Sequence, residues 1–176
     1  MPKVVCTIMH VCMLKNRPGG IVDLQKFESL VAEVTSRIAG KPVDKDLEAF
    51  LNEEFPADGE MFKYIESACH QAVSEGWMCN REQGGIKFGR VIKPGDATHG
   101  FSVDVVEMED IVGPHHAHPN GEIDMIMPLD TDARFDDAGK GWLVYSPGSS
   151  HKPTVTGGAA YVLYLLPEGA IEFSRG

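Results

Sequence analysis

The chain has 176 residues, of which 43% are apolar and 24% charged, a composition typical of a globular domain and not of a disordered or fibrous chain. Its 26 acidic residues outnumber the 16 Lys and Arg residues, and the net charge of −10 disfavours binding to nucleic-acid phosphates. No stretch of the sequence approaches the ~20 apolar residues of a membrane span. We therefore expect neither a nucleic-acid nor a membrane partner.

The first 20 residues are ambiguous. Their apolar run over residues 4–14 could form a strand, and no small-residue cleavage site of a secretory signal follows it. The chain has four cysteines, and none of them forms a CxxC pair. Together these features predict reduced thiols in a cytoplasmic protein.

Three amphipathic helices are predicted in the first half of the chain. Asp23 can cap a helix whose apolar residues recur at three- and four-residue spacing up to Gly40. A second helix follows Asp44 and stops before Pro56, and a third lies between Pro56 and Gly76. Each helix has one narrow apolar face, so we expect the helices to pack on another part of the chain.

From residue 84 onward the pattern changes to short strands. They are predicted between Gly, Pro and Asp turns, over residues 86–92, 101–105, 123–127, 142–145 and 159–166. Short strands with regular turns are typical of a sandwich or a small barrel. The predicted fold is therefore α+β, with a helical segment over residues 1–80 packed on an antiparallel β-barrel over residues 84–176.

Histidines gather near the middle of the predicted barrel. Of seven histidines, three fall within residues 115–118. Residues two apart in a strand share a face, so His116 and His118 project together, and a bend at residues 119–121 can bring Glu122 towards them. His151 follows a Pro-Gly turn and is the best candidate for a fourth ligand. Such a donor set suits one divalent ion of Fe, Mn, Ni or Zn.

Two other interpretations of the metal-binding residue types stay open. The histidine-rich segment could be a solvated surface loop that binds metal adventitiously. Cys6, His10 and Cys12 share strand parity and could form a separate metal site, although buried thiols explain them more simply. Arg134 lies in an acidic loop with Asp130, Asp132, Asp136 and Asp137, and we expect it to form a salt bridge at the surface.

The two histidine segments resemble the two motifs of the cupin superfamily. The first cupin motif carries His-x-His and then Glu, as in His116-Ala-His-Pro-Asn-Gly-Glu122. The second has Gly, five residues, Pro-Gly and a His, as in Gly141-Trp-Leu-Val-Tyr-Ser-Pro-Gly-Ser-Ser-His151, here one residue shorter between Pro and Gly. The resemblance implies a cupin barrel (double-stranded β-helix, or jelly roll) and the ligands His116, His118, Glu122 and His151. The motifs depart from the pattern at Asp110, Leu129 and Val155, which puts the connecting turns in doubt.

The whole layout is similar to the 4-hydroxylaminobenzoate lyase family. The shared features are a helical front, then Gly-Pro-His-His-x-His-Pro-x-Gly-Glu-Ile-Asp and Gly-Trp-x-Val-Tyr-x-Pro-Gly-Ser-x-His. The resemblance implies conversion of 4-hydroxylaminobenzoate to protocatechuate with loss of ammonia. The implied partner is a small aromatic or otherwise anionic metabolite.

Three further residues are catalytic candidates for such a substrate. An inward Arg90 would bind a carboxylate beside Phe88. Asp124 shares the parity of Glu122 and could orient a ligand imidazole, as carboxylates behind metal ligands do. Tyr145 could donate a hydrogen bond to a substrate oxygen.

Two rival functions use the same predicted barrel. One is a metal-dependent dioxygenase acting on a catechol-like ring, and the other is a cupin that binds a small molecule without turnover. In each case sheet edges that need covering predict a homodimer.

Overall fold

The computed structural model describes residues 20–174 of the chain. Three helices come first, namely α1 (Leu24–Ile38), α2 (Lys45–Glu54) and α3 (Glu60–Ser74). The Asp23 side chain accepts a hydrogen bond from the Lys26 amide, which confirms the predicted cap. The second helix begins after Asp44 as predicted, and the Asp44 side chain accepts from the Leu47 amide. No helix in this part of the chain is long and apolar enough to cross a bilayer. The possible strand over residues 4–14 lies outside the described residues, as do Cys6, His10 and Cys12.

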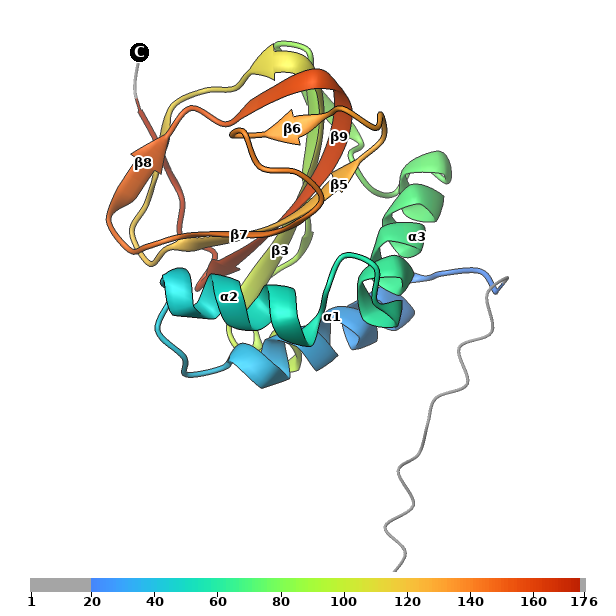
Figure 1. Cartoon of the computed structure of the whole chain (residues 1–176). Helices are drawn as coiled ribbons and strands as arrows, with labels where there is room; N and C mark the ends of the chain where they lie inside the picture. The colour runs from blue at the N-terminus through green and yellow to red at the C-terminus, as the bar shows by residue number, and fades with distance from the viewer. Residues whose placement is uncertain (1–19, 175–176) are drawn as a thin grey trace, which may run out of the picture.

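Ten strands follow the helices and form two antiparallel sheets. Their bounds are β1 (Arg81–Gln83), β2 (Ile86–Ile92), β3 (Phe101–Val112), β4 (His116–His118), β5 (Glu122–Pro128), β6 (Arg134–Phe135), β7 (Gly141–Tyr145), β8 (Ser149–His151), β9 (Thr154–Pro167) and β10 (Glu172–Phe173). The larger sheet has the order β1-β2-β3-β9-β5-β7, with β6 paired to β9, and the smaller has the order β10-β4-β8. In Figure 1 the strands outline a barrel with α1 and α2 below it and α3 to its right. The predicted α+β fold, helices followed by an antiparallel cupin-like barrel, is confirmed.

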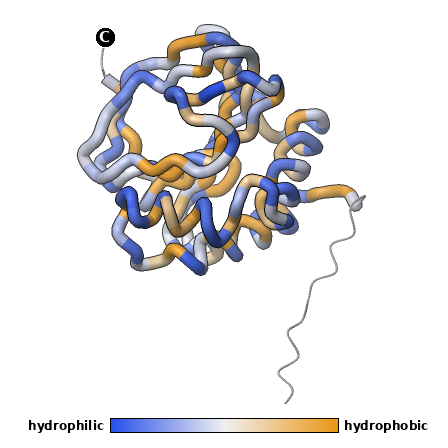
Figure 2. Tube along the Cα trace, viewed as in Figure 1, coloured by the Kyte–Doolittle hydropathy of each residue, from blue (hydrophilic) through white to orange (hydrophobic). Residues whose placement is uncertain are grey.

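The larger sheet separates two apolar cores. Over residues 101–108 of β3, 123–127 of β5 and 160–166 of β9, the odd-numbered residues, such as Val103, Met125 and Leu163, pack against the helices. Even-numbered residues, such as Ile126 and Val162, face the inside of the barrel. This alternation is the two-residue period of a strand buried on both faces. In Figure 2 the helices carry hydrophilic and hydrophobic stretches by turns, as expected of helices that cover a sheet with one face.

Helix α2 covers the edge of the larger sheet at β7. The Asn52 amide nitrogen donates to the Trp142 carbonyl at 2.9 Å, and its oxygen accepts from the Trp142 amide at 3.0 Å. Glu48 accepts from the Val144 amide at 2.8 Å. These side chains take the place of a further strand, so the helical segment blocks an edge that would otherwise pair with another chain. The opposite edge strand, β1, has all three residues exposed.

Strand β9 begins five residues before the predicted start at residue 159. The difference arises at Gly157 and Gly158, whose φ angles are +77° and +124°. A Cβ atom on Gly157 would lie 2.5 Å from the carbonyl oxygen of Asp132, so only glycine fits there. A glycine pair breaks the strand pattern in the sequence, but here it lets a long strand continue through an irregular stretch.

Candidate metal centre

Three strands bring the four predicted ligands together. Strand β4 carries His116 and His118, β5 carries Glu122, and β8 carries His151. His116 and His151 are direct partners across the β4–β8 pair, so their side chains share the inner face of the smaller sheet. One donor atom from each of the four residues lies within 4.8 Å of all the others. Residues from three separate strands thus place their donor atoms close enough together to bind one ion.

The turn between His118 and Glu122 depends on Gly121. Its amide donates to the His118 carbonyl at 3.2 Å, and its φ angle is +87°. A Cβ atom here would lie 2.7 Å from the Val43 side chain and 2.9 Å from the Tyr145 carbonyl oxygen. The glycine therefore permits both the backbone conformation and the close approach that bring the Glu122 carboxylate back onto the imidazoles.

The Nδ1 atom of each imidazole points away from the cluster and towards a hydrogen-bond partner. The partner of His116 is the Pro114 carbonyl at 3.3 Å, and that of His118 is the Ser149 hydroxyl at 3.0 Å. This hydroxyl gives its own proton to the Ser146 carbonyl at 2.6 Å, so it accepts from His118. The Nδ1 atom of His151 meets the Asp136 carboxylate at 2.5 Å. Acceptors on Nδ1 place the proton there and leave the Nε2 lone pair free to bind a metal.

The Nε2 atoms of the three histidines point towards Glu122, and this group of atoms has few hydrogen-bond partners. The His118 Nε2 atom lies 3.2 Å from a Glu122 oxygen, and the Nε2 atoms of His116 and His151 lie 3.1 Å apart. The His118 Nε2 atom and both Glu122 oxygens are buried without a hydrogen-bond partner among the described residues. Lone pairs that face one another at this distance repel unless a proton or a cation lies between them. The donor set and its orphaned atoms therefore fit one divalent ion.

The protonation of the cluster follows from burial and from its own charges. Burial lowers the pKa of His118 to about 4 and keeps it neutral. Burial opposes the charge on Glu122, but the three imidazoles outweigh it and hold the pKa of that carboxyl below its usual value. Burial also opposes the charge on His151, but Asp136 and Glu122 outweigh it and raise the pKa of His151 to about 9. A divalent ion would replace the proton that His151 carries in its absence.

Asp136, and not Asp124, makes the contact with a ligand imidazole that the sequence predicted. Asp124 is fully buried beside Glu122, and its carboxylate oxygens have no hydrogen-bond partner in residues 20–174. The expected contact of Asp124 with a ligand imidazole is therefore not made; Asp136 contacts His151 instead. Burial and the charge of Glu122 raise the pKa of Asp124 well above its usual value. Arg134, in the same acidic loop as Asp136, is exposed as expected but forms no ion pair with residues 20–174, whereas Asp136 turns inward to His151.

Tyr145 lies against the cluster. Its ring centroid is 4.4 Å from that of His151 and 5.4 Å from that of His118. Its hydroxyl donates to Asp136 at 2.5 Å, and burial together with that carboxylate raises the pKa of Tyr145 above its usual value. The sequence suggested that the Tyr145 hydroxyl donates to a substrate oxygen, but in the structure it donates to Asp136.

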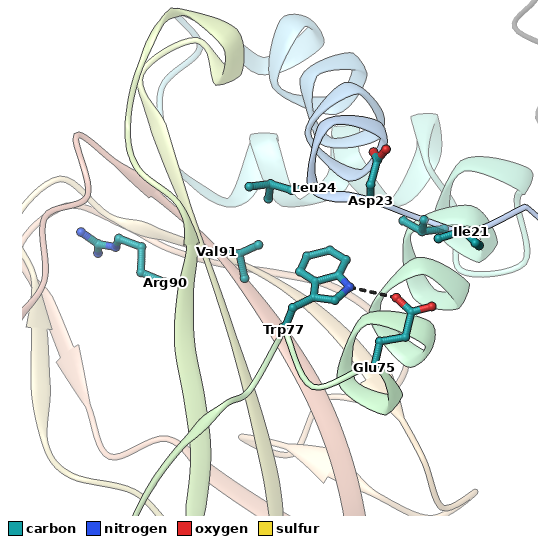
Figure 3. Close-up of a pocket in the computed structure, with 8 residues that line it drawn as sticks. Ile21, Asp23, Leu24, Glu75, Trp77, Arg90 and Val91 are labelled. Carbon is teal, nitrogen blue, oxygen red and sulfur yellow. Dashed lines mark hydrogen bonds between the residues drawn. The ribbon is translucent and has the colours of Figure 1, made fainter.

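Arg90 ends a row of paired residues on the larger sheet, and its side chain is 36% exposed. The pairings Arg90–Asp104, Asp104–Tyr164 and Tyr164–Asp124 align these residues across four strands. The Arg90 Nε atom donates to Asp104 at 3.0 Å, and Nη2 donates to the Gly169 carbonyl at 3.2 Å, whereas Nη1 makes no hydrogen bond with a described residue. In Figure 3 the guanidinium points away from Trp77.

Figure 3 shows a pocket on the helix side of the sheet. It lies between the start of α1, the end of α3 and β2, and Trp77 donates to Glu75 at its wall at 3.1 Å. Its lining residues are Ile21, Val22, Asp23, Leu24, Glu75, Trp77, Arg90 and Val91. None of the metal ligands belongs to it, so we place the candidate site inside the barrel.

The family model and the similar known proteins all point to the same family. The family described as "PnbB: 4-hydroxylaminobenzoate lyase" matches residues 29–173. A 4-hydroxylaminobenzoate lyase from Pseudomonas putida is 30% identical over 161 residues, which cover 82% of this chain and 92% of the relative. One from Nocardioides sp. (strain LMS-CY) is 32% identical over 150 residues, covering 80% and 86%.

Solved structures are more distant. An RmlC-like cupin protein from Ralstonia eutropha aligns with a TM-score of 0.38 and 11% identity over 53% of this chain and 62% of that chain. Oxalate oxidase in complex with glycolate aligns with a TM-score of 0.39 and 23% identity over 52% and 56%. These TM-scores are too low to support an argument about the fold, so the barrel is described from its strand pairings alone.

Removing one imidazole should remove the metal. We expect His118→Ala and His151→Ala to lower affinity for a divalent ion by more than the ~10–100-fold that changes behind the ligands cost. Metal content and chelator competition measure this effect. His115→Ala is the matched control, because His115 is half-buried and bonds Ser174 at 2.5 Å instead of facing the cluster. Unchanged metal content in both ligand variants would contradict the assignment.

Proposed function

This chain belongs to the 4-hydroxylaminobenzoate lyase family, and we propose that it converts 4-hydroxylaminobenzoate to protocatechuate and ammonia. The names of the relatives identify the chain as an enzyme of the lyase class. We propose His116, His118, Glu122 and His151 as the ligands of one divalent ion at its active site. The observation that carries the proposal is this buried cluster, whose imidazoles all present Nε2 to one point.

The proposed conversion needs water but no external oxidant. One water enters, the N–O bond breaks, two ring carbons gain a hydroxyl each, and the nitrogen leaves as ammonia. The hydroxylamine oxygen and the water oxygen together account for the two ring hydroxyls. The nitrogen is reduced by the two electrons that the ring loses, so molecular oxygen has no part in the balance. A bound ion would supply Lewis acidity towards the hydroxylamine oxygen or towards water.

Two residues in one row of the larger sheet support binding of an aromatic acid. Nη1 of Arg90 makes no hydrogen bond within residues 20–174 while Asp104 holds Nε, so the guanidinium is oriented and has a donor to offer a substrate carboxylate. Asp104 is itself held by the Ser102 hydroxyl at 3.0 Å. Asp124 lies in the same row, two residues from Glu122, and its unpartnered carboxyl group is available to a molecule bound at the cluster.

Tyr145 has a different proposed part from the one the sequence suggested. Because its proton is donated to Asp136, its oxygen can only accept a hydrogen bond from a bound molecule. We propose that Tyr145 contacts the substrate in this way while its ring packs on His151.

An anaerobic assay tests the proposed reaction. Metal-loaded protein is mixed with 4-hydroxylaminobenzoate without oxygen, and ammonia and protocatechuate are measured. We expect both products in equal amounts, in proportion to the metal content and lost after chelation. Turnover that needs oxygen would support the dioxygenase instead. No product from metal-replete protein would overturn the proposed reaction and leave a binding protein or another chemistry.

Arg90 should act through the substrate carboxylate. We expect Arg90→Ala to raise KM by ~10–100-fold, the value of a hydrogen bond to a charged group, with a smaller change in kcat. Steady-state kinetics with the acid and with its uncharged amide analogue measure the effect. Arg134→Ala is the control, because Arg134 is exposed and forms no ion pair with any of residues 20–174. Equal losses on the acid and on the amide would contradict a carboxylate contact.

A further inference from the structure

Asp136 is fixed at its turn by strand β9. Its amide donates to the Thr154 carbonyl at 2.8 Å, and its Oδ1 atom accepts from the Thr154 amide at 2.8 Å. The φ angle of Asp136 is +47°, a left-handed conformation that Asp and Asn tolerate better than other non-glycine residues. Two bonds to one residue thus leave the carboxylate little freedom to turn.

The other carboxylate oxygen of Asp136 faces the metal centre. It accepts from the Tyr145 hydroxyl and from the His151 Nδ1 atom, each at 2.5 Å. An ionised carboxylate can only accept hydrogen bonds, and this one already receives two, from the Thr154 amide and the Tyr145 hydroxyl, so Nδ1 of His151 must be the protonated nitrogen. The lone pair of His151 is then on Nε2, which lies 3.5 Å from Glu122 and 3.1 Å from the Nε2 atom of His116.

We propose that Asp136 is the positioning residue of the metal centre. It fixes the tautomer and the ring plane of His151, with Tyr145 bonded to the same oxygen so that the carboxylate cannot rotate away. His151 is the ligand that most needs this support, because its side chain is 12% exposed whereas those of His118 and Glu122 are fully buried. Asp136 reaches the metal only through His151.

Metal affinity tests this proposal without any turnover. We expect Asp136→Asn to weaken Zn²⁺ binding to the apo protein by ~10–100-fold, measured by chelator competition. Asn suits the left-handed turn and can still accept from the Thr154 amide, but its NH₂ group would meet the Nδ1 proton. Asp137→Asn is the matched control, since it removes the same charge from an exposed neighbour whose φ is +67°. Equal Zn²⁺ affinity in the two variants would overturn the proposal.

Two further measurements separate positioning from a general structural effect. In a double-mutant cycle, Asp136→Asn should have no further effect on affinity once His151 is replaced by Ala, because the two residues act as a unit. In ¹⁵N NMR spectra of the wild-type Zn²⁺ protein, His151 should carry its proton on Nδ1. A proton on Nε2 would overturn the proposal even if the Asn variant failed to fold.

A second inference comes from the register of the smaller sheet. Phe173 on β10 is the direct partner of His116, which in turn pairs with His151, so the three side chains share the inner face. The ring centroids of Phe173 and His116 lie 5.5 Å apart in an edge-to-face arrangement. Phe173 nevertheless remains 58% exposed, unlike His116 at 2%. An accessible aromatic ring therefore stands directly beside a proposed ligand.

The segment that leads to Phe173 is attached to Arg90. The Gly169 carbonyl accepts from Arg90, and the Glu168 amide donates to the Gly100 carbonyl at 2.8 Å, before Ile171 packs into the inner core. The Arg90 guanidinium and the Phe173 ring are thus both connected to one short segment, residues 168–173, of the barrel. We propose that Phe173 packs on the ring of an aromatic acid, an inference that rests on the proposed function.

Binding of unreactive acids tests this second inference. We expect Phe173→Ala to weaken 4-hydroxybenzoate binding by ~3–10-fold and cyclohexanecarboxylate binding less, and Phe173→Tyr to restore it, because ring packing adds to area burial. Val112→Ala is the control, since Val112 is also 58% exposed but pairs with Thr154 and lies outside the row of Phe173, His116 and His151. Unchanged affinity in Phe173→Ala, or a wild type that binds no aromatic acid, would overturn the inference. Aromatic-acid binding without ammonia release would overturn only the proposed reaction.

Discussion

A carboxylate buried among three imidazoles is the constraint on which the rest of this structure depends. Glu122 has no exposed side-chain surface, and a charge there is unfavourable unless it is compensated. Three Nε2 atoms face this carboxylate, but acceptors on the far sides of the rings leave lone pairs on them, which cannot compensate its charge. Such an arrangement is costly for a fold with nothing in its centre, and it becomes favourable with a cation bound. The cluster therefore fits the one divalent ion that we propose for this site.

The acidic character of the chain extends into the barrel. Asp104, Glu122, Asp124 and Asp136 all face inward, whereas Arg90 is bound to only one of them. A divalent ion would balance part of this negative charge. The same distribution makes Arg90 important, because an anionic substrate would otherwise meet a field of its own sign.

The helical segment stabilises the barrel from outside. Its apolar faces share one core with β3, β5 and β9, and Asn52 and Glu48 saturate the backbone of β7. Strand β7 pairs with β5, the strand of Glu122 and Asp124. The helices thus support the site through the edge strand, although no helical residue belongs to the ligand cluster. The division into residues 1–80 and 84–176 and the homodimer remain predictions.

The sequence by itself determined what depends on short-range periodicity. Helix caps at Asp23 and Asp44, the strand over residues 86–92 and the shared face of His116 and His118 follow from spacing of three, four or two residues. Only the tertiary structure decided that Asp136, rather than Asp124, contacts a ligand imidazole, and that Phe173 stands beside His116. Neither contact has a local period: the first depends on a left-handed turn tied to β9, and the second on the pairing of two strands more than fifty residues apart. Such contacts are set by the closure of the barrel, which brings together groups whose separation along the chain carries no signal.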